Sequence, residues 1–105
     1  MATANLDVFQ VIADPSRRQI LHLLTKDRYN INKLAENFEM SRPAVSKHVK
    51  VLQKAGFISI QEIGRERYCV LSPEGFNEIS NWLDHFDNFW NNKLKKLETI
   101  LNNKK

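Results

Sequence analysis

The side chains of this 105-residue sequence that could do chemistry are mainly basic. Residues 41–71 carry six Lys and Arg against two Glu, whereas acidic and basic residues balance in 1–40 and in 72–105. The whole formal net charge of +4 therefore lies in the middle third of the chain. Such a concentration is typical of a surface that faces a polyanion, most simply nucleic-acid phosphate. Charge alone leaves an ordinary solvated face open as the alternative.

Catalytic and metal chemistry have little support in the sequence. It holds no nucleophile elbow, no phosphate-binding loop and no paired-carboxylate pattern, which predicts that the protein is not an enzyme. The single cysteine, Cys69, cannot form an intrachain disulfide or a thiolate cluster. We expect it to be a small residue in a strand, with a role that the sequence leaves open. No cofactor and no metal site are predicted.

The basic residues gather on a helix expected over 41–55. Ser41 is a good N-cap, Pro43 suits the first turn, and Gly56 suits the left-handed position after the last turn. Val45, Val49 and Leu52 have the spacing i, i+4, i+7 and predict the buried side. The side chains left on the outer face and its flank are Arg42, Ser46, Lys47, His48 and Lys50.

Three further helices are expected before this one, over 6–13, 15–25 and 31–38. Asp14 followed by Pro15 predicts the start of the second, and Asn30 predicts the start of the third. The third and fourth helices, joined by residues 39–41, form a candidate helix-turn-helix over about 31–55.

Residues 57–71 predict a two-stranded hairpin, because apolar and polar residues alternate on both sides of the segment "EIGRER". Gly64 is free to take a positive φ in the turn, and Arg65 and Arg67 lie next to it. A hairpin in this place is a wing.

A last helix of roughly 30 residues is expected over 73–102, capped by Ser72-Pro73. At about 1.5 Å per residue it is too long for one small core to cover its apolar stripe, so we expect a second copy of the chain to cover the rest. The residues expected in this dimer interface are Leu6, Phe9, Ile79, Trp82, Leu83, Phe86, Phe89, Trp90, Leu94 and Leu97.

The order of elements predicts a mainly α single domain over 1–105 with a small β-hairpin (α+β), laid out as a winged helix-turn-helix. In that layout the second helix of the motif enters the major groove and the wing meets the backbone or the minor groove. We expect Arg42 to contact a guanine, and Lys47 and Lys50 to contact phosphates. One of Arg17 and Arg18 is expected to pair with an aspartate, Asp14 or Asp7, and the other to contact a DNA phosphate. The expected DNA-binding residues are Ser41, Arg42, Pro43, Ala44, Ser46, Lys47, His48, Lys50, Gly64, Arg65 and Arg67.

Three motifs, "DPSRRQILHLL", "SRPAVSKHVKVLQKAGFI" and "GRERYCVLSP", resemble in order and spacing the ArsR/SmtB family of bacterial and archaeal winged-helix repressors. The resemblance covers nearly the whole chain. It implies a homodimer formed by the first and last helices, which binds a palindromic operator in double-stranded DNA and blocks transcription.

Many members of that family sense metals, and here the chain departs from their pattern. Asn30 and Asn32 stand where the resemblance would place a pair of cysteine ligands, and Asn is a poor ligand for zinc or arsenite. On the last helix, Asp84, His85 and Asp87 are not followed by a second ligand pair. The chain therefore resembles the subgroup without metal sites, which includes simple autorepressors.

Two other functions stay open at this point, and the effector is unknown. One is a repressor of the same family that responds to a metal or to a small apolar ligand. The other is a protein-interaction module that uses Trp82, Phe86, Phe89 and Trp90 of the last helix. No apolar run is long enough to span a bilayer and the N-terminus does not read as a signal peptide, which predicts a cytoplasmic protein without membrane contact.

Overall fold

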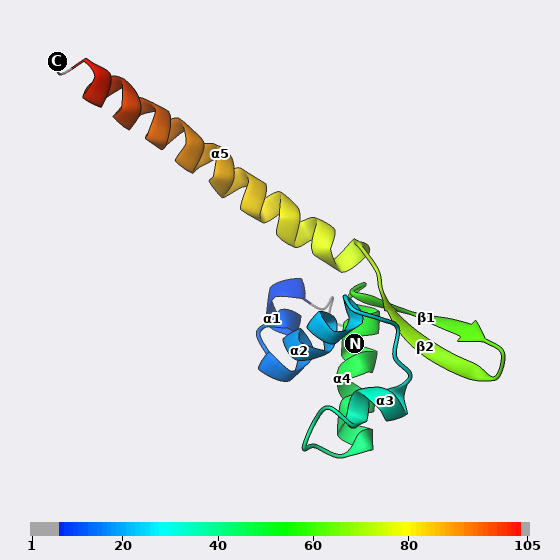
Figure 1. Cartoon of the computed structure of the whole chain (residues 1–105). Coiled ribbons are helices and arrows are strands. Elements are labelled where there is room, and N and C mark those ends of the chain that lie inside the picture. Colours follow the sequence, from blue (N-terminus) through cyan, green and yellow to red (C-terminus); the bar gives the residue numbers. More distant parts are fainter. Residues whose placement is uncertain (1–6, 104–105) are drawn as a thin grey trace.

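The computed structural model describes residues 7–103, and its element order is the predicted one. Four helices are followed by an antiparallel hairpin and one long helix (Figure 1). The elements are α1 (Val8–Ile12), α2 (Pro15–Leu24), α3 (Ile31–Ala35), α4 (Arg42–Lys54), β1 (Ile58–Ile63), β2 (Glu66–Leu71) and α5 (Glu74–Asn102). This arrangement confirms the winged helix-turn-helix with a mainly α, α+β composition.

One hydrophobic core joins the first four helices to the base of the hairpin. Val45, Val49 and Leu52 are all buried, which confirms the predicted inner side of α4. Cys69 supplies the buried position of β2. The other buried residues are Val8, Val11, Ile20, Leu21, Leu24, Leu34, Phe57 and Ile58.

Local capping chemistry sets most of the helix ends. Side-chain oxygens of Asp14, Asn30 and Ser41 accept hydrogen bonds from backbone amides in the first turns of α2, α3 and α4, as the sequence predicts. Gly56 has φ +86° just after α4, a conformation that side chains with a Cβ rarely adopt.

Two predicted ends of the early helices are wrong. Helix α1 begins at Val8, and its N-cap is Asp7, whose carboxylate accepts from the amide of Phe9 at 2.9 Å. Leu6 lies outside the described residues. Helix α3 ends at Ala35 and not at residue 38. The chain leaves the helix in a tight turn there, and Phe38 still packs against the core.

The predicted cap of the last helix is also wrong. The N-cap position of α5 is Pro73, and no side chain caps it. Instead the amide of Gly75 donates to the carbonyl oxygen of Gly56 at 2.8 Å, which fixes the start of α5 to the end of α4. A Cβ atom on Gly75 would lie 2.8 Å from the ring of Phe57, so only glycine fits this contact.

The wing is a two-stranded sheet with a tight turn. Ile58 pairs with Leu71 at its base and Ile63 with Glu66 at its tip, and Gly64 has the positive φ (+64°) that the sequence predicts. The base is fixed by a bridge that the sequence did not reveal. The amide of Cys69 donates to the carbonyl of Tyr29 at 2.7 Å, and the reverse bond is 3.4 Å long. The segment before α3 therefore lies against β2.

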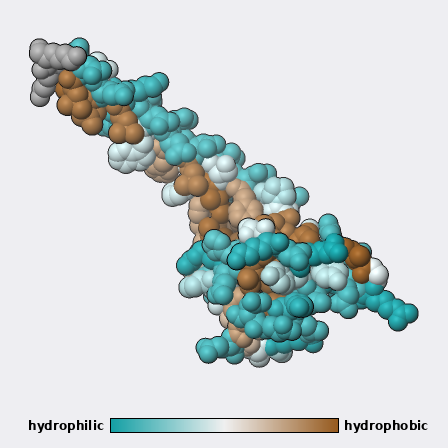
Figure 2. All heavy atoms as spheres, viewed as in Figure 1, coloured by the Kyte–Doolittle hydropathy of each residue, from teal (hydrophilic) through white to brown (hydrophobic). Residues whose placement is uncertain are grey.

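Helix α5 leaves the rest of the molecule and projects away from it (Figure 1). The chain measures 68 × 35 × 27 Å and its radius of gyration is 19.3 Å. A compact chain of this length would have a radius of about 13 Å. Apolar side chains continue along the projecting helix (Figure 2). No helix in the described residues is long and apolar enough to cross a membrane.

Candidate nucleic-acid interface

Helix α4 presents its polar side to solvent, because its apolar stripe faces the core. The side chains of Arg42, Lys47 and Lys50 are exposed, and Ser46 and His48 are half-buried. The first turn is fixed by Ser41, whose hydroxyl accepts from the amide of Ala44 at 3.3 Å. Pro43 stands in that turn and is exposed, and Ala44 is half-buried.

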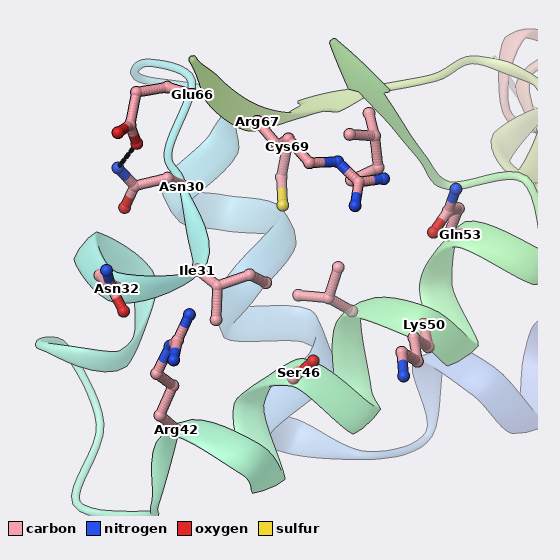
Figure 3. Close-up of a pocket in the computed structure, with 12 residues that line it drawn as sticks. Asn30, Ile31, Asn32, Arg42, Ser46, Lys50, Gln53, Glu66, Arg67 and Cys69 are labelled. Carbon is pink, nitrogen blue, oxygen red and sulfur yellow. Dashed lines mark hydrogen bonds between the residues drawn. The ribbon is translucent and has the colours of Figure 1, made fainter. Parts of the chain in front are cut away.

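A cleft of about 300 Å³ lies between α4, the start of α3 and the wing (Figure 3). Arg42, Lys50 and Arg67 place three cations around it, and Asn30, Asn32 and Gln53 add amide groups. The full lining is Asn30, Ile31, Asn32, Arg42, Ser46, Val49, Lys50, Gln53, Ile60, Glu66, Arg67 and Cys69. Such a mixture of cations and amide donors suits contact with phosphates and base edges.

The cleft separates the predicted α4 residues into two groups. Arg42, Ser46 and Lys50 line it, and Gln53 continues their row toward the C-terminal end of α4 (Figure 3). Lys47 is exposed but does not line the cleft. Gln53 is not among the predicted DNA-binding residues, although its place in the i, i+4, i+8, i+11 row could have identified it. Asn30 was predicted as a helix cap, and Asn30 and Asn32 as replacements for metal ligands, but neither was predicted to bind DNA.

The wing carries less free positive charge than the sequence suggests. Nε of Arg67 lies 3.8 Å from a carboxylate oxygen of Glu62 on the opposite strand, and both side chains are well exposed, so the pair adds little stability. Glu66 accepts from the side-chain amide of Asn30 at 2.9 Å, which fastens the wing to the start of α3. Arg65 is exposed next to Gly64 in the turn.

Both arginines at the start of α2 bind backbone oxygens near the end of α1, so the predicted side-chain pairing with an aspartate is wrong. Nε of Arg17 donates to the carbonyl of Val11 at 2.7 Å. Nη1 of Arg18 donates to the carbonyls of Ile12 and Ala13 at 2.7 and 2.9 Å. These hydrogen bonds satisfy carbonyl oxygens that have no partner at the end of a short helix.

His48 faces the start of α2, and its Nδ1 lies 3.3 Å from Nη1 of Arg17. Asp14 belongs to the same cluster. Partial burial opposes its ionisation, but the backbone amides of Arg17 and Ser16 and the charge of Arg17 hold the pKa of its carboxyl below the ordinary value of 3.8. Nδ1 of His48 is therefore engaged in a contact within the chain.

Cys69 closes the inner end of the cleft, with its sulfur pointing into it (Figure 3). The residue is 1% exposed. Burial raises the pKa of its thiol to about 11 despite the nearby charge of Arg67. The thiol is therefore protonated at neutral pH, which makes it a packing group rather than a nucleophile. The described residues hold no group of three or more potential metal ligands.

Of the residues predicted for a dimer interface, Phe9 lies on α1, and those of α5 lie along one stripe of that helix. The ring of Phe9 meets that of Trp82 edge-on at 5.2 Å, and Ile79 packs against the core. Beyond this contact with α1 the stripe has no cover in the described chain. Its exposed apolar members are Trp82, Leu83, Phe86, Phe89, Trp90, Leu94, Leu97, Ile100 and Leu101.

Comparison with known proteins identifies the family. Residues 14–59 match the model of the bacterial regulatory proteins of the arsR family. The transcriptional repressor SdpR of Bacillus subtilis is 35% identical over 88 residues, which cover 84% of this chain and 98% of SdpR. The chain belongs to the ArsR family.

Solved structures share the fold of this chain. A crystal structure of a possible transcriptional regulator for arsenical resistance is 39% identical, with a TM-score of 0.69 over 88% of this chain and 93% of that one. The homodimeric winged helix-turn-helix DNA-binding domain of Mb0332 from Mycobacterium bovis shares the fold, with a TM-score of 0.61 at 20% identity over 77% of this chain and 75% of that one. The chain is thus a DNA-binding winged-helix transcriptional regulator and not an enzyme.

Proposed function

We propose that the protein is a homodimeric repressor that binds a palindromic operator with α4 and the wing of each copy. The observation that carries this proposal is the three-sided cleft, in which Arg42 and Lys50 of α4 lie opposite Arg67 of the wing. Cations on two separate elements around one groove are the arrangement that a DNA backbone and its base edges require. The name of SdpR, a transcriptional repressor, supports repression as the outcome.

The DNA-binding residues proposed earlier take different roles in this interface. In the proposed complex Arg42, at the N-terminal end of α4, reaches a base edge, and Lys47 and Lys50 bind phosphates. Gly64 and Arg65 bring the wing turn to the neighbouring groove. Gln53, Asn30 and Asn32 join the set because they line the same cleft.

The exposed stripe of α5 supports the homodimer. Trp90, Leu94 and Leu97 are 58, 59 and 52% exposed, although each is a large apolar side chain. An apolar row of this length on a water-exposed helix is stabilised when another surface covers it, and a second copy offers the same row. Two copies related by a two-fold axis would present two α4 helices to successive turns of a palindrome, about 34–36 Å apart.

Fluorescence anisotropy with duplex DNA from the region upstream of the protein's own gene tests the proposal. Lys47→Ala with Lys50→Ala removes two phosphate contacts in each subunit, so it should weaken binding to all sequences and flatten the salt dependence. Arg42→Ala should instead relax the preference at one base position, at a cost of about 1–3 kcal/mol. Lys26→Ala with Lys33→Ala removes equal charge outside the cleft and is the control. Equal effects of the two lysine pairs would refute the proposed interface.

A further inference from the structure

The end of α4 and the start of α5 meet at Phe57. Its side chain is 0% exposed and packs edge-on against the ring of Phe76, with the ring centroids 4.9 Å apart. The amide of Phe57 donates to the carbonyl of Leu52 in α4 at 2.9 Å, and its carbonyl accepts from the amide of Ser72, just after the wing, at 2.9 Å. Phe57 is therefore held both by α4 and by the segment between the wing and α5, which leaves its buried ring little room to move.

Gly75, in the first turn of α5, rests directly on this ring. A Cβ atom at Gly75 would lie 2.8 Å from two carbons of the Phe57 ring and 3.0 Å from the carbonyl oxygen of Ala55, the C-cap of α4. Cβ atoms do not approach other atoms within 3.0 Å, so a side chain here would force the helix away. Helix formation alone would favour alanine over glycine. The close approach of α5 to α4 is what requires glycine.

This junction determines the angle between the two helices on which the proposed function depends. Helix α4 carries Arg42 and Lys50 of the DNA interface, and α5 carries the apolar stripe proposed to hold the dimer. Trp82 gives α5 a second attachment, where its ring meets that of Phe9 at 5.2 Å, and the helix projects from there (Figure 1). A change of angle at the junction therefore moves the two α4 helices of a dimer relative to each other.

A small displacement at Gly75 is enlarged at the DNA surface. Lengthening the contact from 2.8 Å to 3.4 Å, where ordinary contacts begin, requires a shift of about 0.6 Å. Trp82 lies about 10 Å further along α5, so a shift about that attachment turns the helix by ~3°. Arg42, about 20 Å from the junction along α4, would then move by ~1 Å relative to α5. In two copies the change adds up to ~2 Å, which is more than half of the rise of about 3.4 Å per base pair.

We propose that Gly75 is a positioning residue for DNA recognition. By letting α5 rest on Phe57, it sets the angle between α5 and α4, and thereby the spacing between half-sites that the dimer accepts. The side chains that contact DNA in this proposal remain those of α4 and the wing. The inference rests on the proposed homodimer on a palindromic operator, and it specifies what determines the spacing of that operator.

A series of duplexes tests the proposal. The spacer between the two halves of the palindrome upstream of the protein's own gene is kept, or lengthened or shortened by one or two base pairs, and binding is followed by fluorescence anisotropy. The wild-type chain should prefer one spacing. Gly75→Ala should lose about tenfold in affinity for that duplex, a loss comparable with one mismatched base pair. The ratio of its affinities should shift toward a neighbouring spacing.

Three further variants separate positioning from stability. Ile20→Val makes the buried core smaller, so it should lower the free energy of unfolding in urea and leave the spacing preference unchanged. Asn77→Ala changes an exposed residue in the same turn as Gly75 and should alter neither quantity. Gly75→Leu carries a larger side chain, so it should move the preference further in the same direction as Gly75→Ala.

The ratio of affinities between spacings decides the outcome. A weakened fold or a weakened dimer would lower the affinity for every duplex by the same factor and leave the ratio as it is in the wild-type chain. An unchanged ratio in Gly75→Ala would therefore overturn the positioning role, whether or not the affinity falls. A ratio changed equally by Ile20→Val would overturn it too.

The two proposals can fail separately. A wild-type chain that binds every spacing no better than a scrambled duplex would refute operator binding, and the positioning role with it. A wild-type chain with a clear preference that Gly75→Ala does not change would refute the positioning role alone.

Discussion

Nη1 of Arg17 lies 3.3 Å from Nδ1 of His48, which joins the start of α2 to the flank of α4. A guanidinium can only donate hydrogen bonds, so Nδ1 must accept and the ring proton must sit on Nε2. The contact therefore needs a neutral His48. Since Nε of Arg17 also holds the carbonyl of Val11, this one side chain connects three helices.

Removing the His48 ring should loosen this connection. His48→Ala leaves the guanidinium without its acceptor, and we expect the free energy of unfolding in urea at pH 7.5 to fall by about 1 kcal/mol. His22→Ala, at an exposed position on α2, should change it by less than about 0.5 kcal/mol. Equal losses in the two variants would show that the Arg17 contact adds no stability.

The acid stability of the fold should depend on Asp14. Its folded-state pKa lies below 3.8, so the stability that its ionised form adds is present above that pH and is lost as the pH falls through the folded-state pKa. Asp14→Asn keeps a good N-cap and removes the charge, whereas Asp14→Ala removes both and should cost about 1 kcal/mol at pH 7. Urea unfolding at pH 7 and pH 3 should show a larger deficit of Asp14→Asn at the higher pH. A deficit of the same size at pH 3 would contradict the assigned shift.

Cys69 should resist thiol reagents until the solution is strongly alkaline. Because its folded-state pKa is raised from 9.0 to about 11, the stability gained from its neutral form is present below pH 9.0 and lost as the pH rises through 11. Cys69→Ser places a hydroxyl in the core and should cost about 1–3 kcal/mol of folding free energy. This cost should exceed that of Cys69→Ala if the polarity of the side chain, and not its volume, determines the stability. Rapid alkylation of the native protein at pH 8 would contradict this account.

The contact between Asn30 and Glu66 should hold the wing in place for DNA. Asn30→Ser keeps a cap for α3 and loses the bond to the wing, while Glu66→Gln keeps an acceptor at nearly the same position. We expect faster amide hydrogen exchange in β2 and weaker operator binding in Asn30→Ser, and little change in Glu66→Gln. The reverse order would show that the charge of Glu66 matters and the bond does not.

Local signals in the sequence were enough to predict the elements that carry the interface. Asn30, Ser41 and Gly56 mark helix ends through bonds to their own neighbours, and the spacing of Val45, Val49 and Leu52 shows the inner side of α4. These features depend on residues a few positions apart, so they can be recognised from the amino-acid sequence.

Features that depend on distant residues were missed. The bridge between Tyr29 and Cys69 joins positions forty residues apart, and neither residue type signals it. The spacing within α4 puts Gln53 in one row with Arg42, Ser46 and Lys50, but only the position of the wing shows that this row lines a cleft. Arg17 and Arg18 were misassigned because carbonyls at the end of a short helix compete with carboxylates for arginine, and sequence shows only the carboxylates.

In the complex that we propose, two chains hold one palindromic operator through α4 and the wing. Titration of a labelled duplex, at a concentration well above the dissociation constant, measures this stoichiometry directly. We predict saturation at two chains per palindrome, and much weaker binding to a duplex with only one half-site at the same salt concentration. Saturation at one chain per duplex, or equal affinity for the palindrome and a scrambled sequence, would contradict the account.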